Sequence, residues 1–276
     1  MTPSPPPLSS PIAFIGGGNM ASALIGGLLR QGLPAGQIEV VEPFEPARAA
    51  LLGRFGVTAR PAPTVALERA ALVVWAVKPQ TFKDAALPAA AHTARALHLS
   101  VAAGIGTQSI AGWLGTQRIV RAMPNMPALV GQGMTGLFAR AGADAAAKTQ
   151  VEQVIASTGQ YLWVSAEEQL DAVTALSGSG PAYVFLFLEA MTQAGADMGL
   201  PPAQARQLAV ATFQGAAELA ARSGESPEAL RQRVTSKGGT THAAITHMQQ
   251  RQVPEHFIEA MRKAQERARE LATEFG

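Results

Sequence analysis

Residues 12–21 read Ile-Ala-Phe-Ile-Gly-Gly-Gly-Asn-Met-Ala, and this stretch decides the fold of the chain. Its four apolar residues predict a buried parallel strand, and the apolar spacing from Ala21 to Leu29 predicts a helix immediately after it. The glycines between them follow the pattern G-x-G-x-x-A. Gly16 permits a tight turn, Gly18 lets a pyrophosphate approach the backbone, and the small Ala21 lets helix and strand pack closely. The N–H groups of the first helical turn then face the anion.

A glycine pattern of this kind is a weak signal by itself, because an ordinary strand-to-helix turn without a ligand can carry it. A second strand, expected over Ile38–Val41, ends at Glu42, which lies 24 residues after Gly18. A carboxylate at that place accepts hydrogen bonds from the ribose of a dinucleotide. We therefore interpret residues 12–42 as a dinucleotide site.

Strand and helix patterns keep alternating after this site. Further strands are expected over residues 71–77, 97–102 and 118–122, and helices over residues 46–55 and 80–91. Such alternation is typical of a parallel sheet that is covered by helices on both faces and joined by right-handed crossovers. The sequence thus predicts an α/β fold with a doubly wound Rossmann-type parallel sheet over residues 11–165.

The pattern changes near residue 166, where amphipathic helical runs replace the alternation. They are expected over residues 167–176, 181–198, 202–222, 227–234, 241–250 and 254–273. Proline near the start of several of these runs is typical of a first helical turn. We expect residues 166–276 to form an all-α domain.

The helix expected over residues 181–198 is apolar on more than one face. The residues responsible are Val184, Phe185, Leu186, Phe187, Leu188 and Met191. A helix that is apolar all round has to be buried on all sides, which a domain of this size achieves with difficulty. Helices from a second copy would complete the burial, so we predict a homodimer; a central place in its own bundle is the alternative.

The composition describes a globular protein of 276 residues, with 47% hydrophobic residues, 15% charged residues and no cysteine. A net charge of +2 without a Lys/Arg cluster argues against a nucleic-acid partner. Residues 1–10 lack the basic start and apolar run of a secretory signal, so we expect a disordered leader. The apolar run 183–188 stops at Glu189 and is too short to cross a bilayer. We expect a cytoplasmic protein without a membrane partner.

Three expected strands end in small or rigid residues, at Ala76–Pro79, Ala102–Gly104 and Met123–Pro127. In an open α/β sheet, ligands bind beyond the carboxyl ends of the strands. We therefore expect these turns to surround the cofactor, although Gly and Pro are also common in ordinary turns.

Two glycine turns of the helical half are candidate carboxylate sites, because each precedes a helix whose N–H groups are free to bind an anion. Residues 177–181 read Ser-Gly-Ser-Gly-Pro, which an ordinary capped helix start also explains. Residues 236–241 read Ser-Lys-Gly-Gly-Thr-Thr, which exceeds what capping requires, so an anion site is favoured there.

Histidine is absent between Leu99 and Thr241, and lysine between Thr149 and Ser236. Oxidation of an alcohol needs a base for the hydroxyl proton, usually His or Lys. A protonated C=N bond needs only positioning and a hydride, so the sequence favours such a substrate. His242 and His247 are five residues apart with no carboxylate to complete a triad, so we expect no metal site.

Several motifs of the chain together resemble the pyrroline-5-carboxylate reductase family. The most specific are Asp-Ala-Val-Thr-Ala-Leu-Ser-Gly-Ser-Gly-Pro-Ala-Tyr at residues 171–183 and Val-Thr-Ser-Lys-Gly-Gly-Thr-Thr at residues 234–241, joined by residues 14–19, 76–79 and 120–125. The resemblance spans residues 11–268. It implies reduction of 1-pyrroline-5-carboxylate to L-proline with NADPH or NADH, the last step of proline biosynthesis from glutamate.

The resemblance also implies a set of site residues. Cofactor contacts are expected at Phe14, Ile15, Gly16, Gly17, Gly18, Asn19, Met20, Glu42, Ala76, Val77, Lys78, Pro79, Ala103, Gly104 and Asn125. The substrate carboxylate is expected at Gly238, Gly239, Thr240 and Thr241, with Thr241 as the catalytic residue near the ring nitrogen and Ser177 as a further substrate contact. In the family this loop completes the partner subunit's site in an intertwined helical dimer, and some members form a decamer of five dimers.

Three residues depart from the family pattern. Lys237 stands where many members have Pro, and Pro63-Thr64 where members often have Asn at an adenosine contact. Glu42 stands where members that prefer NADPH can have a hydroxyl residue. A carboxylate accepts a hydrogen bond from a free 2′-hydroxyl but repels a 2′-phosphate, so we predict competent use of NADH. A hydroxy-acid dehydrogenase of similar architecture and a non-catalytic nucleotide-binding redox sensor are the alternatives.

Overall fold

The computed structural model describes residues 10–275, so the expected disordered leader lies outside the described residues except for Ser10. The described chain forms two compact units. We call residues up to Ser179 together with residues from Ala264 onward the Rossmann unit, and Gly180–Lys263 the helical unit. By compactness the chain thus divides after Ser179, whereas the pattern of the sequence changes at residue 166, because the first helix after that change packs with the sheet.

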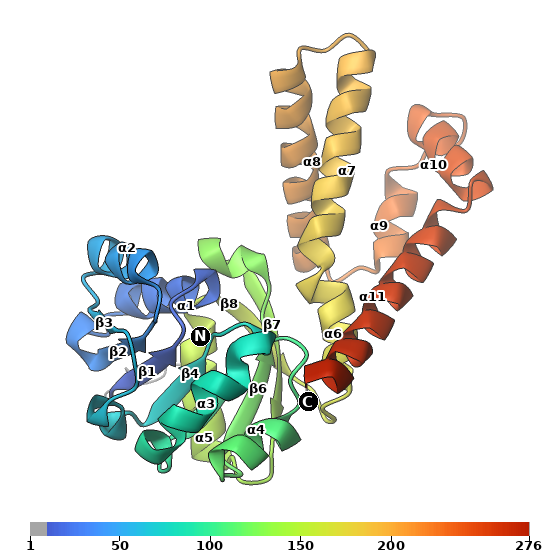
Figure 1. Ribbon diagram of the computed structural model, residues 1–276. Helices are drawn as coiled ribbons and strands as arrows, with labels where there is room; N and C mark the ends of the chain where they lie inside the picture. Colours follow the sequence, from blue (N-terminus) through green and yellow to red (C-terminus); the bar gives the residue numbers. More distant parts are fainter. Residues whose placement is uncertain (1–9, 276) are drawn as a thin grey trace. The chain divides into compact units, whose positions relative to one another are not determined.

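The Rossmann unit is built on an eight-stranded sheet in the order β3-β2-β1-β4-β5-β6-β7-β8 (Figure 1). The strands are β1 (Ile12–Ile15), β2 (Ile38–Val41), β3 (Ala59–Arg60), β4 (Leu72–Trp75), β5 (Leu97–Ser100), β6 (Ile119–Met123), β7 (Gly133–Ala139) and β8 (Gly159–Trp163). Strand β1 is central, since its four residues pair in parallel with β2 on one side and β4 on the other. The neighbouring strands β3, β2, β1, β4, β5 and β6 all run parallel, so their carboxyl ends lie at one edge of the sheet.

The expectation of a fully parallel sheet was wrong at one place. Strand β7 runs antiparallel to β6, with Arg121 opposite Phe138, and β8 is then parallel to β7. Neither β7 nor β8 was expected, because glycines interrupt β7 and because Tyr161 and Leu162 of β8 are exposed at the sheet edge. Their apolar residues do not form the continuous run that marks a buried parallel strand.

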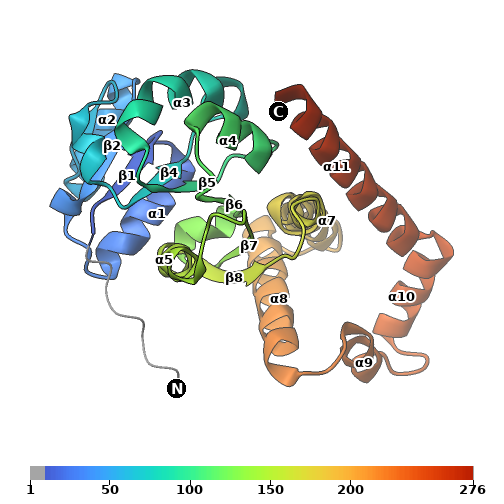
Figure 2. The same cartoon turned by 90° about the horizontal axis from the view of Figure 1, so that it is seen from below.

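Helices cover both faces of the sheet, as the sequence predicts (Figure 2). They are α1 (Asn19–Arg30), α2 (Glu45–Phe55), α3 (Pro79–Thr93), α4 (Thr107–Leu114), α5 (Ala145–Ala156), α6 (Gln169–Val173) and the last part of α11 (Val253–Phe275). Alternate residues of β1 enter two separate cores: Ile12 and Phe14 pack with α1 and α5, while Ala13 and Ile15 pack with α3 and α4. The doubly wound fold class is confirmed.

The helical unit contains α7 (Gly180–Asp197), α8 (Pro202–Ser223), α9 (Pro227–Arg233), α10 (Thr240–Gln250) and the first part of α11. Helices α7 and α8 pack closely at Gly195, where an added Cβ would lie 2.7 Å from the Cβ of Ala205. Phe257 of α11 packs edge-on against Tyr183 and Phe187 of α7. None of the helices over residues 10–275 is long and apolar enough to cross a membrane.

Much of the apolar surface of α7 and α8 stays exposed in the single chain. Large exposed side chains are Val184, Phe185, Leu186, Met191, Leu208, Val210 and Leu219. Helix α7 is therefore not buried on all sides by the other helices of its unit. This argues against a central place in its own bundle and favours burial against a second copy. Contiguous exposed apolar surface of this kind marks a protein interface.

The glycine turn at residues 177–181 leads into the expected helix, since α7 begins at Gly180, but no loop precedes it. Helix α6 continues through a π-helix, Thr174–Gly178, into α7, and the N–H of Ser179 donates to the carbonyl of Thr174 at 2.8 Å. The expectation of free N–H groups was wrong at Ser179, because π-type hydrogen bonding continues up to this residue.

Candidate functional site

The turn between β1 and α1 requires the glycine at position 16. Gly16 has φ +98°, and an added Cβ would lie 2.5 Å from the carbonyl oxygen of Ala76. The tight turn thus brings the ends of β1 and β4 into contact. An added Cβ on Gly18 would meet no atom of the described residues within 4 Å. The absence of a side chain at Gly18, the N-cap of α1, therefore leaves open space in front of the first N–H groups of the helix.

Glu42 lies against this turn. Its carboxylate accepts hydrogen bonds from the N–H of Gly17 at 2.7 Å and from the N–H of Phe44 at 2.8 Å. Arg48 donates to the carbonyls of Glu42 and Pro43 and so fixes the chain after β2. Each carboxylate oxygen can accept a second hydrogen bond, so Glu42 can still receive a ribose hydroxyl.

The turn after β4 starts helix α3. Pro79 is the first residue of α3 and Lys78 is its N-cap, with an exposed side chain. The carbonyl side of Ala76 faces Gly16, whereas Val77 packs against the core under α3 and α4. Ala76 and Val77 therefore lie beside the glycine turn, and Lys78 and Pro79 follow them at the start of α3.

The turns after β5 and β6 follow at the same edge. Gly104 packs against Leu271 of α11, since an added Cβ would lie 3.1 Å from the Cβ of Leu271. Asn125 donates through its amide to the Oγ of Ser177 at 3.1 Å and accepts from the N–H of Met134 at 3.0 Å. The structure thus brings together Asn125 and Ser177, which were expected at the cofactor and at the substrate, and uses both to hold the turn after β6 against the π-helix.

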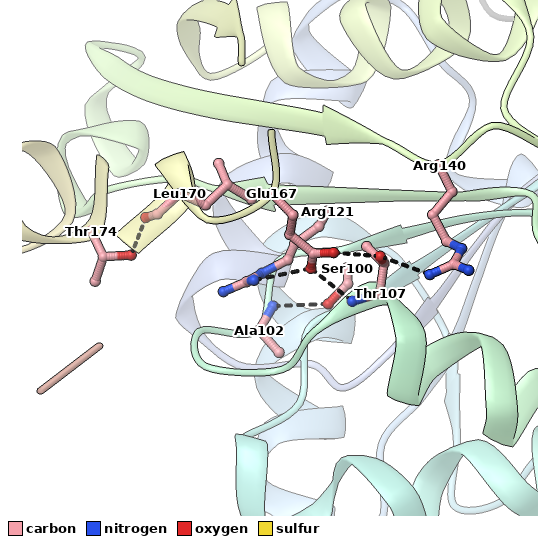
Figure 3. A network of polar contacts seen from close by, with 8 residues as sticks. All are labelled: Ser100, Ala102, Thr107, Arg121, Arg140, Glu167, Leu170 and Thr174. Carbon is pink, nitrogen blue, oxygen red and sulfur yellow. Dashed lines mark hydrogen bonds and ion pairs between the residues drawn. The ribbon is translucent and has the colours of Figure 1, made fainter. Parts of the chain in front are cut away.

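A polar network that the sequence did not predict supports these turns (Figure 3). Glu167 accepts from the N–H of Thr107 at 2.7 Å, from its hydroxyl at 2.6 Å and from Arg121 at 3.1 Å. Arg140 donates to the hydroxyl of Thr107 at 3.2 Å. The signal for this network was Arg121, a charged residue in the middle of an apolar strand, where its side chain is only 6% exposed.

Asp171 on α6 is a second buried carboxyl beside Arg121. Burial raises its pKa, while the charges of Arg121 and Arg269 act in the opposite direction. Arg269 lies in the part of α11 that belongs to the Rossmann unit, so α11 ends close to this acidic helix.

The second glycine turn, in the helical unit, does begin a helix. Gly238 has φ +77°, Gly239 is the N-cap of α10, and Thr240 and Thr241 are its first residues. A glycine N-cap provides no side chain for the first-turn N–H groups, so these remain available to an anion. Thr240 is exposed and Thr241 is half-buried. Within residues 10–275, no three His, Asp or Glu side chains are grouped so as to hold a metal ion.

The fold and the turn geometry define a class: a dinucleotide-dependent oxidoreductase with a Rossmann unit and a helical unit. Residues 11–104 match the family model "NADP oxidoreductase coenzyme F420-dependent", and residues 167–271 match "Pyrroline-5-carboxylate reductase dimerisation". The chain belongs to the pyrroline-5-carboxylate reductase family.

Individual relatives agree along their whole length. Pyrroline-5-carboxylate reductase of Pseudomonas aeruginosa is 45% identical over 272 residues, which cover 98% of this chain and 100% of that protein. The enzyme of Haemophilus influenzae is 41% identical over 96% of this chain and 98% of its own. The structure of a pyrroline-5-carboxylate reductase from Coxiella burnetii has a TM-score of 0.89, with 38% identity, and covers 96% of this chain and 99% of that one.

Proposed function

We propose that this protein reduces 1-pyrroline-5-carboxylate to L-proline with NAD(P)H, as the last step of proline biosynthesis. The observation that carries the proposal is the 45% identity with a pyrroline-5-carboxylate reductase over 98% of this chain, which includes both units. A hydroxy-acid dehydrogenase and a redox sensor are set aside, because the match extends over the substrate-side half of the chain.

The dinucleotide fits the Rossmann unit. Its phosphates would lie at residues 14–20, where Gly18 leaves open space before α1, and its adenosine ribose would lie at Glu42. The nicotinamide half would follow the strand ends at residues 76–79, at residues 103–104 and at Asn125. When bound, the reduced nicotinamide supplies the hydride.

Glu42 makes NADH a competent cofactor. Its carboxylate lies 2.7 Å from the N–H of Gly17, at the place where the 2′-substituent of the adenosine ribose would lie. A free 2′-hydroxyl donates a hydrogen bond to that carboxylate, whereas a 2′-phosphate brings a second negative charge beside it.

The substrate carboxylate would be held by the first N–H groups of α10, at residues 238–241. Hydrogen bonds from main-chain N–H groups and the positive end of the helix favour an anion there. Thr241 would place its hydroxyl at the ring nitrogen of the cyclic imine. Ser177 remains a proposed substrate contact, although its hydroxyl already bonds to Asn125.

This arrangement needs no strong base. The imine is protonated before the hydride arrives, so the residues of the chain bind the carboxylate, orient the ring and exclude water. Fixing two reactants in an attack geometry contributes about 7–11 kcal/mol to lowering the barrier in favourable cases. Orientation of the two reactants therefore accounts for most of the rate acceleration. This agrees with the lack of His and Lys in residues 149–236.

The protein forms a homo-oligomer through its pyrroline-5-carboxylate reductase dimerisation region. We infer a dimer in which the loop 236–241 of one subunit completes the site of its partner; assembly of dimers into a decamer and a cytoplasmic location are further inferences from the family. The exposed apolar side chains of α7 and α8 support the dimer. Light scattering that returned a monomer at micromolar concentration would contradict it.

The activity is tested by following NADH and NADPH oxidation side by side with 1-pyrroline-5-carboxylate and by identifying the product. Stoichiometric L-proline is expected. Cofactor oxidation without proline, or no oxidation with either cofactor, would overturn the proposed function.

A further inference from the structure

The carboxylate of Glu167 joins three elements of the Rossmann unit that are far apart in the sequence. It follows the sheet and precedes α6, yet it bonds to Thr107 at the first residue of α4 and to Arg121 on β6. Figure 3 shows the three side chains meeting at the carboxyl ends of the strands.

Glu167 supplies the N-terminal cap that α4 lacks. The N-cap residue, Gly106, has no side chain to accept from the first-turn N–H groups, and the first turn, Thr-Gln-Ser, carries no acidic residue. Both oxygens of Glu167 accept from Thr107, at 2.7 Å from its N–H and 2.6 Å from its hydroxyl. A negative charge at a helix N-terminus also interacts favourably with the helix dipole. The start of α4 is thus fixed by a residue 60 positions later in the chain.

The turn after β5 ends where α4 begins. At its first end the N–H of Ala102 donates to the hydroxyl of Ser100, and at its other end Thr107 bonds to Glu167. Between these two anchors lie residues 103–106, in which Ile105 is buried in the core and Gly104 packs against Leu271. Glu167 fixes the end of this loop at which α4 begins, and so contributes to the position of Ala103 and Gly104.

The turn after β6 depends on the same carboxylate. Arg121 is almost fully buried, and Glu167 is its ion-pair partner at 3.1 Å. Asp171 is a further carboxyl close to Arg121. Removal of Glu167 would leave Arg121 with Asp171 alone and would shift its guanidinium from the position that the pair with Glu167 fixes. Arg121 lies four residues before Asn125, which holds the turn 123–127 against the π-helix. Glu167 is thus linked to two of the three strand-end turns expected around the nicotinamide.

We propose that Glu167 is a positioning residue for hydride transfer, which holds the loop 102–106 and, through Arg121, the turn 123–127 in the geometry that the nicotinamide half of the cofactor requires. It touches neither substrate nor cofactor. The proposal rests on the proposed function, because that function places these turns at the nicotinamide. The phosphate and adenosine contacts at Gly16–Met20 and Glu42 lie at other strand ends and do not involve Glu167.

The test compares Glu167→Ala and Glu167→Gln with the control Glu168→Gln. Glu168 is the next residue, is exposed, and carries the same charge. Two quantities are measured: the rate constant of NADH oxidation in a single turnover with 1-pyrroline-5-carboxylate, and the Kd of NADH by fluorescence titration. The single-turnover rate constant does not depend on the folded fraction, so a merely structural defect would leave it unchanged.

For Glu167→Ala we expect the single-turnover rate constant to fall about 10- to 100-fold, since displacements on the order of 1 Å have effects of this size. The Kd of NADH should stay within about threefold, because most of the binding contacts lie elsewhere. Glu167→Gln keeps an acceptor for Thr107 but loses the charge that pairs with Arg121, so a smaller loss is expected. Glu168→Gln should behave like the unmodified protein.

A Glu167→Gln protein whose rate constant equals that of Glu168→Gln would overturn the proposal, and this variant decides the question if Glu167→Ala does not fold. An equal loss of NADH affinity and rate would also overturn it, because Glu167 would then support binding as a whole. If the unmodified protein oxidises no NAD(P)H with this substrate, the proposed function fails first, and the proposal fails with it.

Discussion

The most quantitative prediction concerns His98, a buried histidine on β5. It is 1% exposed, and its Nδ1 accepts a hydrogen bond from the Nε1–H of Trp75 at 3.1 Å. Burial is the main cause that lowers the pKa of His98 from 6.5 to about 4, with Arg118 adding to the shift and a backbone hydrogen bond at Thr93 opposing it. The folded protein therefore keeps His98 neutral at a pH where the unfolded chain is protonated.

The sign of the effect follows from proton binding. Between pH 6.5 and 4 the unfolded chain binds more protons than the folded protein at this residue, so stability falls as the pH falls. With these two pKa values the free energy of unfolding decreases by about 2 kcal/mol at pH 5 and about 3 kcal/mol at pH 4, relative to pH 8. Above pH 6.5 the loss is absent.

Urea unfolding followed by tryptophan fluorescence is the suitable assay. All three tryptophans, Trp75, Trp113 and Trp163, lie in the Rossmann unit, so their fluorescence reports on the unit that contains His98. The comparison is with His98→Asn, whose Oδ1 can accept from Trp75 but does not titrate. The difference between the two stability curves should change by about 2 kcal/mol from pH 8 to pH 5. Curves that stay parallel within about 0.5 kcal/mol would refute the reasoning.

Four further predictions concern the site. Glu42→Ser should raise the ratio of kcat/KM for NADPH over NADH by at least about tenfold, or about 1.4 kcal/mol, because a charge beside the 2′-phosphate is removed; an unchanged ratio in initial-rate assays would exclude Glu42 from the ribose site. Gly16→Ala should lower the free energy of unfolding by about 2–4 kcal/mol, because the added Cβ meets the carbonyl of Ala76. Gly18→Ala, whose added Cβ meets nothing, should unfold like the unmodified protein but bind NADH more weakly by fluorescence titration; equal affinity would place the phosphates elsewhere. Thr241→Ala should lower kcat with 1-pyrroline-5-carboxylate by about tenfold and leave the Kd of NADH unchanged; unaltered kinetics would remove Thr241 from the reaction.

Local patterns were enough to predict the first half of the fold. The strands β1 and β2 begin and end where the apolar runs do, and the glycine turn that separates β1 from α1 lies at the same edge of the sheet as the end of β4, as expected. These features depend on residues adjacent in the chain or in neighbouring strands. Glu42 was expected at the ribose of the cofactor, which stays a prediction; the bond between its carboxylate and the N–H of Gly17 was not expected.

The segment around α6 and the last strands of the sheet show where such patterns fail. A Ser-Gly-Ser-Gly-Pro segment resembles a capped helix start, but the backbone between Thr174 and Ser179 keeps helical hydrogen bonds of the π type. The residues of this segment do not by themselves indicate a π-helix. Helix α6 packs against β6 and β7, and that tertiary packing is not encoded in the local spacing. Strand β7 was missed in a similar way, because its direction follows from its pairing with β6.

The sequence by itself determined the Rossmann-type sheet, the glycine turn before α1, the acidic residue at the end of β2 and the glycine turn before α10, because each is a regularity of residues close together in the chain. Only the tertiary structure decided that Glu167 caps α4, that Arg121 finds its counter-charge there and that Asn125 bonds to Ser177. These contacts join residues 46–60 positions apart, and nothing in the local spacing of polar side chains specifies a partner at that distance.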